Sequence, residues 1–95
     1  MYVVLLKFAQ NRDEAGRFME AHNQWLQRGF DDGVFVLAGS LQVGLGGALI
    51  ACNTTPEELR ARVNEDPFVA NDVVSVEILE ISPSKVDSKL QFLLA

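Results

Sequence analysis

The order of strand-like and helix-like segments constrains the fold of this chain more than any other feature. Four short runs are rich in β-branched and aromatic residues, as strands are, and two longer stretches repeat apolar residues with helical spacing. The strand-like runs are residues 2–8, 34–41, 47–53 and 73–81, and the helix-like stretches are residues 11–30 and 55–66. Together they make a β-α-β-β-α-β unit, which predicts an α+β fold of the ferredoxin-like kind with an antiparallel sheet.

The predicted strands are apolar on both faces. The first run reads Tyr-Val-Val-Leu-Leu over residues 2–6, so its odd and even positions are equally apolar. Helices can cover one face of such a sheet, and the other face then needs a second layer. A chain of 95 residues buries only about 60–65% of its unfolded surface. We therefore predict a homodimer whose interface is the sheet face opposite the helices.

Boundary signals flank the first helix-like stretch. Asn11 is expected to cap its beginning, and Glu14 follows at the spacing of a capping box. Gly29 and the cluster Asp31-Asp32-Gly33 are expected to end the helix, with glycine supplying a positive φ.

Further signals define the second helix and the last strand. Thr55 is the expected N-cap, with Pro56 at the first helical position. The helix should stop at Asp66, because a residue that precedes a proline, here Pro67, avoids the α region. In the last strand the apolar alternation slips at Leu79, which predicts a β-bulge.

Charge and length exclude several classes of function. Eight basic residues are spread singly among thirteen acidic ones, giving a net charge of −5 and no basic patch for nucleic acid or an anionic membrane. The apolar opening run lacks the basic region and cleavage site of a signal peptide, and no run reaches membrane-spanning length. We expect one cytoplasmic domain over residues 1–95. Its core would cover residues 1–81, and a tail over residues 82–95 would dock on the core or on the partner subunit.

The only histidine, His22, lies in the first helix-like stretch. At about 100° per residue it projects into the middle of the apolar stripe. The stripe consists of Ala15, Phe18, Met19, Trp25, Leu26 and Gly29. An imidazole placed there is either a core histidine with both nitrogens bonded to the backbone or a functional group facing a cleft.

Metal and cofactor chemistry find little support in the sequence. One histidine, Cys52 and scattered carboxylates offer no metal-ligand spacing, and Cys52 is expected to be a small buried hydrophobe. No Gly-x-Ser-x-Gly elbow or dinucleotide fingerprint is present. The glycine-rich run at residues 44–47 lacks the lysine and helix of a phosphate loop, so it is expected to be a turn. We expect no cofactor and no metal site.

Several segments together resemble the YciI-like (YCII-related) family. They are the opening strand at residues 1–8, His-x-x-Trp-Leu at His22, Gly39-Ser40-Leu41, Gly46-Gly47, and Glu65-Asp66-Pro67-Phe68-Val69 before the last strand. The resemblance implies a dimeric α+β barrel, in which two sheets pack face to face. It also implies a His–Asp pair in a cleft, here His22 and Asp66.

The residues of this cleft each have a second interpretation. Asp66 alone would be a helix-end acid in solvent, whereas a carboxylate that reaches the first helix would orient the imidazole and stabilise its charged form. Ser40 could bond a ligand or its own backbone. Trp25 and Phe68 are pocket walls by family resemblance, or plain core residues.

Two positions depart from the family pattern. A Gly-Pro-Leu turn common in the family reads Gly39-Ser40-Leu41 here. An arginine often found three residues before the histidine is replaced by Met19. Loss of that arginine removes an anion clamp, which argues against a carboxylate substrate.

Relatives in this family include a dehydrochlorinase that acts on a chlorinated hydroxyhydroquinone, and muconolactone-isomerase-like proteins share the barrel. The resemblance therefore implies a cofactor-independent lyase or isomerase for a small cyclic or aromatic oxygenated compound. His22 would move a proton and Asp66 would hold its tautomer, an arrangement worth about 10²–10⁴-fold in rate. The alternative is a non-catalytic dimer that binds a small metabolite in the same cleft. A histidine with both nitrogens bonded to the backbone would favour the binder, and one nitrogen free toward a cavity would favour the enzyme.

Overall fold

The computed structural model describes residues 1–94, so Ala95 of the predicted tail lies outside the described residues. The strands are β1 (Tyr2–Phe8), β2 (Phe35–Leu41), β3 (Gly46–Ala51) and β4 (Val74–Glu80). The helices are α1 (Ala15–Asp31), α2 (Pro56–Asn64) and the one-turn α3 (Pro67–Ala70), and two 3₁₀ helices are η1 (Arg12–Glu14) and η2 (Ser88–Leu94). The predicted α+β class and the order of its six main elements are confirmed, with α3 added after α2.

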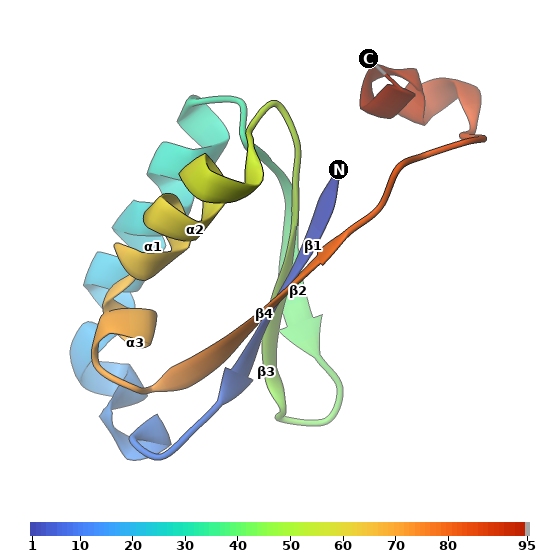
Figure 1. The fold of residues 1–95 in the computed structure, drawn as a ribbon. Helices are drawn as coiled ribbons and strands as arrows, with labels where there is room; N and C mark the ends of the chain where they lie inside the picture. The colour runs from blue at the N-terminus through green and yellow to red at the C-terminus, as the bar shows by residue number, and fades with distance from the viewer. Residues whose placement is uncertain (95) are drawn as a thin grey trace.

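The four strands form one antiparallel sheet in the order β2-β3-β1-β4, with β1 and β3 in its interior. All three α-helices lie on one side of this sheet (Figure 1). β1 pairs with a strand at each of its edges, and the helices cover one of its two faces. The arrangement is the predicted ferredoxin-like unit.

The two faces of the sheet differ in burial. Tyr2, Val4 and Leu6 of β1 point to the helices and are buried. On the other side, which we call the far face, the register aligns Leu37, Ile50, Val3 and Leu79 in one row. Within one chain Leu37 is 52% exposed and Leu79 is 44% exposed. This row of the far face is therefore apolar and uncovered.

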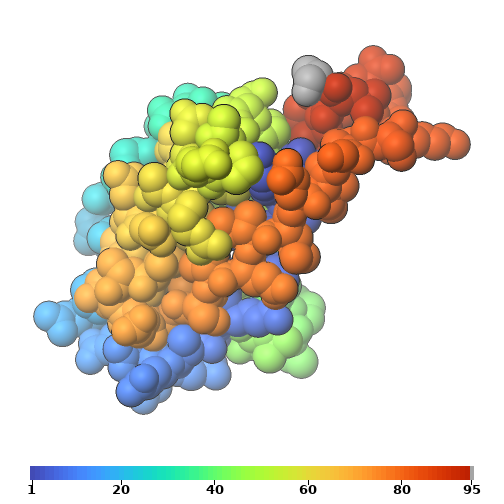
Figure 2. All heavy atoms as spheres, in the orientation of Figure 1, coloured from blue at the N-terminus to red at the C-terminus, as the bar shows by residue number. Residues whose placement is uncertain are grey.

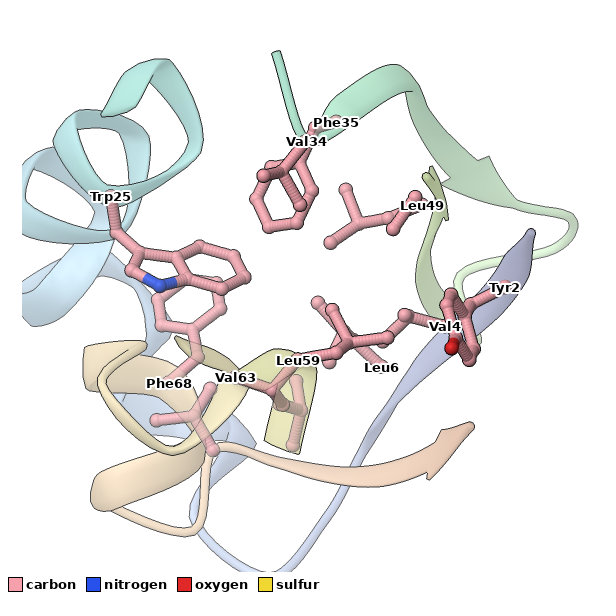
Figure 3. Packing of buried hydrophobic residues seen from close by; sticks show 13 residues of the cluster. Tyr2, Val4, Leu6, Trp25, Val34, Phe35, Leu49, Leu59, Val63 and Phe68 are labelled. Carbon is pink, nitrogen blue, oxygen red and sulfur yellow. The ribbon is translucent and has the colours of Figure 1, made fainter. Parts of the chain in front are cut away.

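The core fills the space between the helices and the sheet. Trp25 of α1 and Leu59 and Val63 of α2 are almost fully buried there, against Phe35 and the inner side chains of β1 (Figure 3). Trp25 Nε1 donates a hydrogen bond of 2.9 Å to the carbonyl of Arg62. This bond satisfies the buried indole and joins α1 to α2.

The predicted boundaries of the first helix need two corrections. Asn11 makes no side-chain cap; its Nδ2 donates to the carbonyl of Asn71 at 2.9 Å, so this amide joins the start of the helical region to the segment before β4. Gly29 does not end the helix but lies inside α1, where a Cβ would come within 2.1 Å of the Phe35 ring. Gly33 supplies the positive φ, at 72°.

The signals at the second helix are confirmed, whereas the predicted bulge is misplaced. The Thr55 side chain accepts the Glu58 N–H at 3.2 Å, and Pro56 begins α2. The pairing of β4 with β1 is regular, and the irregularity lies in β2 between Phe35 and Leu37. The slip at Leu79 instead marks an apolar residue on the far face.

The tail leaves the body of the protein after β4. It runs out on the side of the sheet away from the helices and ends in η2 (Figures 1 and 2). Among residues 1–94, no helix combines the length and the hydrophobicity that crossing a membrane requires.

Candidate active site

His22 and Asp66 come together although they are 44 residues apart in the sequence. His22 Nδ1 and Asp66 Oδ1 are hydrogen-bonded at 2.8 Å. The His22 side chain projects from the inward face of α1 and is 12% exposed, whereas the Asp66 side chain is 0% exposed. The pair thus consists of a buried carboxylate and an imidazole that solvent can reach.

Local sequence places the carboxylate. Pro67 keeps Asp66 out of the α region, at φ −64° and ψ 123°, so α2 ends and a new helix can begin. Asp66 is the N-cap of α3, and its Oδ1 accepts the Phe68 N–H at 3.0 Å. The interpretation of Asp66 as a solvated acid at a helix end is therefore wrong, because Asp66 begins a further helix and points into the protein.

The second carboxylate oxygen of Asp66 is less well accommodated. Oδ2 is buried and accepts no hydrogen bond from any group in residues 1–94. Leaving a buried acceptor unpaired costs about 1–3 kcal/mol. In folded proteins such groups are few, and function or an ordered water commonly accounts for them. The carboxylate is held in place despite this cost.

The His22 ring is fixed on one side by an aromatic neighbour. Phe68 stacks on it with 4.0 Å between ring centroids and 5° between planes. Since a carboxylate can only accept, Nδ1 is the nitrogen that carries the hydrogen, and a neutral ring keeps its lone pair on Nε2. No group within residues 1–94 hydrogen-bonds Nε2. The ring is thus oriented by two contacts, with one nitrogen uncommitted.

A cavity of about 350 Å³ opens next to this ring, between α1 and the strands β2 and β3. Its helix wall contains Met19, His22, Asn23 and Leu26. Its sheet wall consists mostly of small residues, Ala38, Gly39, Ser40, Gly46, Gly47 and Ala48, with Leu49, and Leu6, Phe8, Phe68 and Val74 complete it. The sheet wall is thus made mostly of small residues, and the volume falls in the range of small-molecule sites.

The predicted substrate-binding residues do not all reach this cavity. Ser40 and Phe68 line it, with Ser40 at the strand β2 edge of the sheet and Phe68 beside the imidazole. Trp25 is not among the lining residues. It is 1% exposed and lies behind His22, with 5.8 Å between the two ring centroids. The indole therefore supports the imidazole from the core.

Sequence reasoning missed Asn23 and misread the glycines. Asn23 lies outside the predicted apolar stripe of the helix, but it lines the cavity beside His22. The run at residues 44–47 is predicted to be a turn, but Gly46 and Gly47 of this run also line the sheet wall of the cavity. A Cβ at Gly46 would come within 2.1 Å of the Leu6 carbonyl oxygen, so this glycine is also required by close strand contact. The signal that could have revealed the cavity was the set of small residues in two strands that face the histidine-bearing helix.

The charge of the cavity wall is low. Among the described residues that line it, none is a lysine or arginine, and His22 is the only titratable side chain. Met19 occupies the wall one turn before His22. Within residues 1–94, no group of three histidine, cysteine, aspartate or glutamate side chains could hold a metal ion.

A second hollow, of about 500 Å³, lies on the surface near the end of α1. Two of its charged side chains, Arg62 and Asp32, already neutralise each other in an ion pair at 2.9 Å. It holds no histidine or cysteine. The first cavity is therefore the better candidate for chemistry.

Comparisons with known proteins agree with the fold. The sequence profile of the YCII-related domain matches residues 1–82. A search of curated protein sequences finds no match. The structure is similar to 5-chloro-2-hydroxyhydroquinone dehydrochlorinase from Burkholderia phenoliruptrix, solved in complex with 2,5-dihydroxybenzoquinone. The TM-score is 0.68 at 16% identity, over 85% of this chain and 93% of that chain.

Proposed function

Because the chain belongs to the YCII-related domain family, we propose that it is a cofactor-independent enzyme that moves a proton on a small oxygenated ring compound. His22 is the base and Asp66 orients and stabilises it when it is protonated. The expected reactions are elimination, including loss of chloride as HCl from a chlorinated hydroxyhydroquinone, or isomerisation. Loss of HCl needs a proton acceptor and a leaving group only, so no oxidant or reductant is required.

One observation carries this proposal. Nδ1 of His22 is held by a buried carboxylate, while Nε2 is uncommitted and its ring lines a cavity. A histidine that serves packing alone commonly has both nitrogens satisfied. The pairing of an oriented imidazole with an accessible second nitrogen is the arrangement of a general base.

A non-catalytic dimer that binds a small metabolite in the same cavity is the second candidate. The low charge and small-residue wall of the cavity suit binding without chemistry equally well. The two candidates are separated by incubating the protein with 5-chloro-2-hydroxyhydroquinone under anaerobic conditions and measuring released chloride. Chloride release above the buffer rate supports the enzyme. Saturable binding of the compound without release supports the binder.

The cavity should discriminate against carboxylated rings. With Met19 in the wall and no lysine or arginine among the described lining residues, a carboxylate would lose water without gaining a charged partner. We expect 1,2,4-trihydroxybenzene to bind and 2,5-dihydroxybenzoate to bind at least tenfold more weakly, as measured by calorimetry. Met19→Arg should raise the affinity for the carboxylate ligand about tenfold or more, which is the effect of one charge-assisted hydrogen bond. Met19→Gln is the matched control, and equal affinity of the unaltered protein for both ligands would contradict the prediction.

We also propose that the protein is a homodimer joined through the far face. Leu37 and Leu79 lie on this face and are half exposed in one chain, beside the partly buried Val3 and Ile50. Sedimentation velocity at micromolar concentration should give a dimer. Leu79→Glu should shift it to monomer, because two carboxylates would enter an apolar two-fold interface. Gln24→Glu on the exposed surface of α1 is the control, and a folded monomer for the unaltered chain would refute the interface.

A further inference from the structure

The tail over residues 82–94 carries apolar side chains that its own chain leaves uncovered. Leu90, Phe92 and Leu94 are 45%, 49% and 49% exposed. In the described residues, hydrogen bonds link the body to the tail only as far as Ile81, which bonds Met1 in both directions. Beyond that point the bonds of the tail are local, from the Leu90 and Lys89 N–H groups to Asp87. The hydrogen bonds of this segment are therefore made within its own turn and not with the body.

Sequence explains why the tail does not fold back on its own sheet. Pro83 fixes its own φ and confines Ser82 to extended conformations, so the chain continues outward from β4. Asp87 then begins η2 by accepting the Lys89 N–H at 3.0 Å through its side chain. The result is two short helical turns with a kink at Leu90, carried away from the body on the side of the far face (Figures 1 and 2).

We infer that this tail is an arm that packs against a second copy of the chain. Two apolar surfaces of one chain, the far face and the tail, lie on the same side of the sheet, and the chain alone covers neither. In a two-fold symmetric dimer, the tail of each copy would pack against the other copy, since such an interface uses the same patches on both partners. The inference rests on the proposed dimer but extends it beyond the sheet contact.

Reach and charge agree with a second copy as the partner. Residues 82–87 span at most about 20 Å when extended, and packed sheets are about 10 Å apart, so η2 can pass the edge of a partner sheet. Residues 82–95 hold two lysines and one aspartate, and the remaining residues hold six basic and twelve acidic side chains. The side chains of the tail thus carry a net charge of +1 and those of the remaining residues a net charge of −6, and opposite charges favour the contact.

The arm is tested in the full chain. A photoreactive benzoyl-phenylalanine placed at Phe92 in isotopically light protein is irradiated after mixing and exchange with heavy protein, and cross-linked peptides are identified by mass spectrometry. We expect light-to-heavy cross-links. In parallel, Leu90→Ser combined with Phe92→Ser should raise the dimer dissociation constant at least tenfold in sedimentation equilibrium. Gln91→Ser, a polar position in the same helix, is the matched control and should leave it unchanged.

The outcomes separate the arm from the dimer. If the protein is dimeric but cross-links form only within one copy or not at all, or if the double variant dimerises as well as the control, the arm is refuted and the proposed dimer stands. If the unaltered protein is monomeric, both are refuted. Light-to-heavy cross-links together with weakened dimerisation in the double variant support the arm.

Discussion

His22→Ala is expected to lower the rate of chloride release by about 10²–10⁴-fold, the usual contribution of a positioned general base. The fold should survive, with a loss of about 1 kcal/mol in the free energy of unfolding for the lost stacking contact with Phe68. Removing the ring extends the cavity toward Asp66 and lets water solvate the buried carboxylate. Steady-state kinetics and thermal melts of the same preparation measure both effects.

The control for this variant is His22→Asn. The asparagine amide can still donate to Asp66 from nearly the position of Nδ1, but it has no second nitrogen that could take a proton. We expect the same loss of turnover with a melting temperature close to that of the unaltered protein. If His22→Ala instead destabilises the protein by several kcal/mol, the residue is a core histidine and the general-base assignment fails.

Asp66→Ala is expected to be the most destabilising change in the site. It leaves two donors, His22 Nδ1 and the Phe68 N–H, without their acceptor and removes the cap of α3. Loss of a cap costs about 0.5–2 kcal/mol and each stranded buried donor about 1–3 kcal/mol. We expect a total near 3 kcal/mol, which is about 12–24 °C in the melting temperature of a domain of this size.

Asp66→Asn separates the structural role of this residue from its charge. Asparagine is a good N-cap, and its Oδ1 can accept both hydrogen bonds, while its Nδ2 replaces an oxygen that has no partner among residues 1–94. Stability should therefore fall by no more than about 1–2 kcal/mol. Turnover should still fall strongly, because a neutral amide does not stabilise the imidazolium that forms during proton transfer. Full activity in Asp66→Asn would show that the carboxylate serves the fold alone.

Much of the fold could be predicted because its signals are local. The strands were predicted to within two residues at each end, and α2 was placed by Thr55 and Pro56, since alternation and capping act over a few residues. The failures concern interactions between distant segments. Asn11 bonds Asn71, 60 residues away, and not its own helix, while Gly29 is required by contact with Phe35. No local pattern records such contacts.

The contact between His22 and Asp66 was predictable, but the geometry of the cavity beside it was not. Family resemblance named His22 and Asp66 together, yet the burial of Asp66 depends on α3, a single turn too short to leave a periodic pattern. Helical periodicity left Asn23 out of the apolar stripe, because periodicity cannot show where a cavity interrupts the packing. The cavity itself arises from small residues on β2 and β3, whose glycines resemble those of a turn.

The place of β1 in the sheet also determines how the protein must be assembled during synthesis. This strand is made first, but both of its partners, β3 and β4, are made later, and the closing bonds join Met1 to Ile81, 80 residues away. Such non-local pairing is slow, because the entropy of closing a long loop is lost before any contact repays it. Until β4 has left the ribosome, the nascent chain carries an apolar strand with at least one free edge, which is the kind of segment that chaperones protect from aggregation.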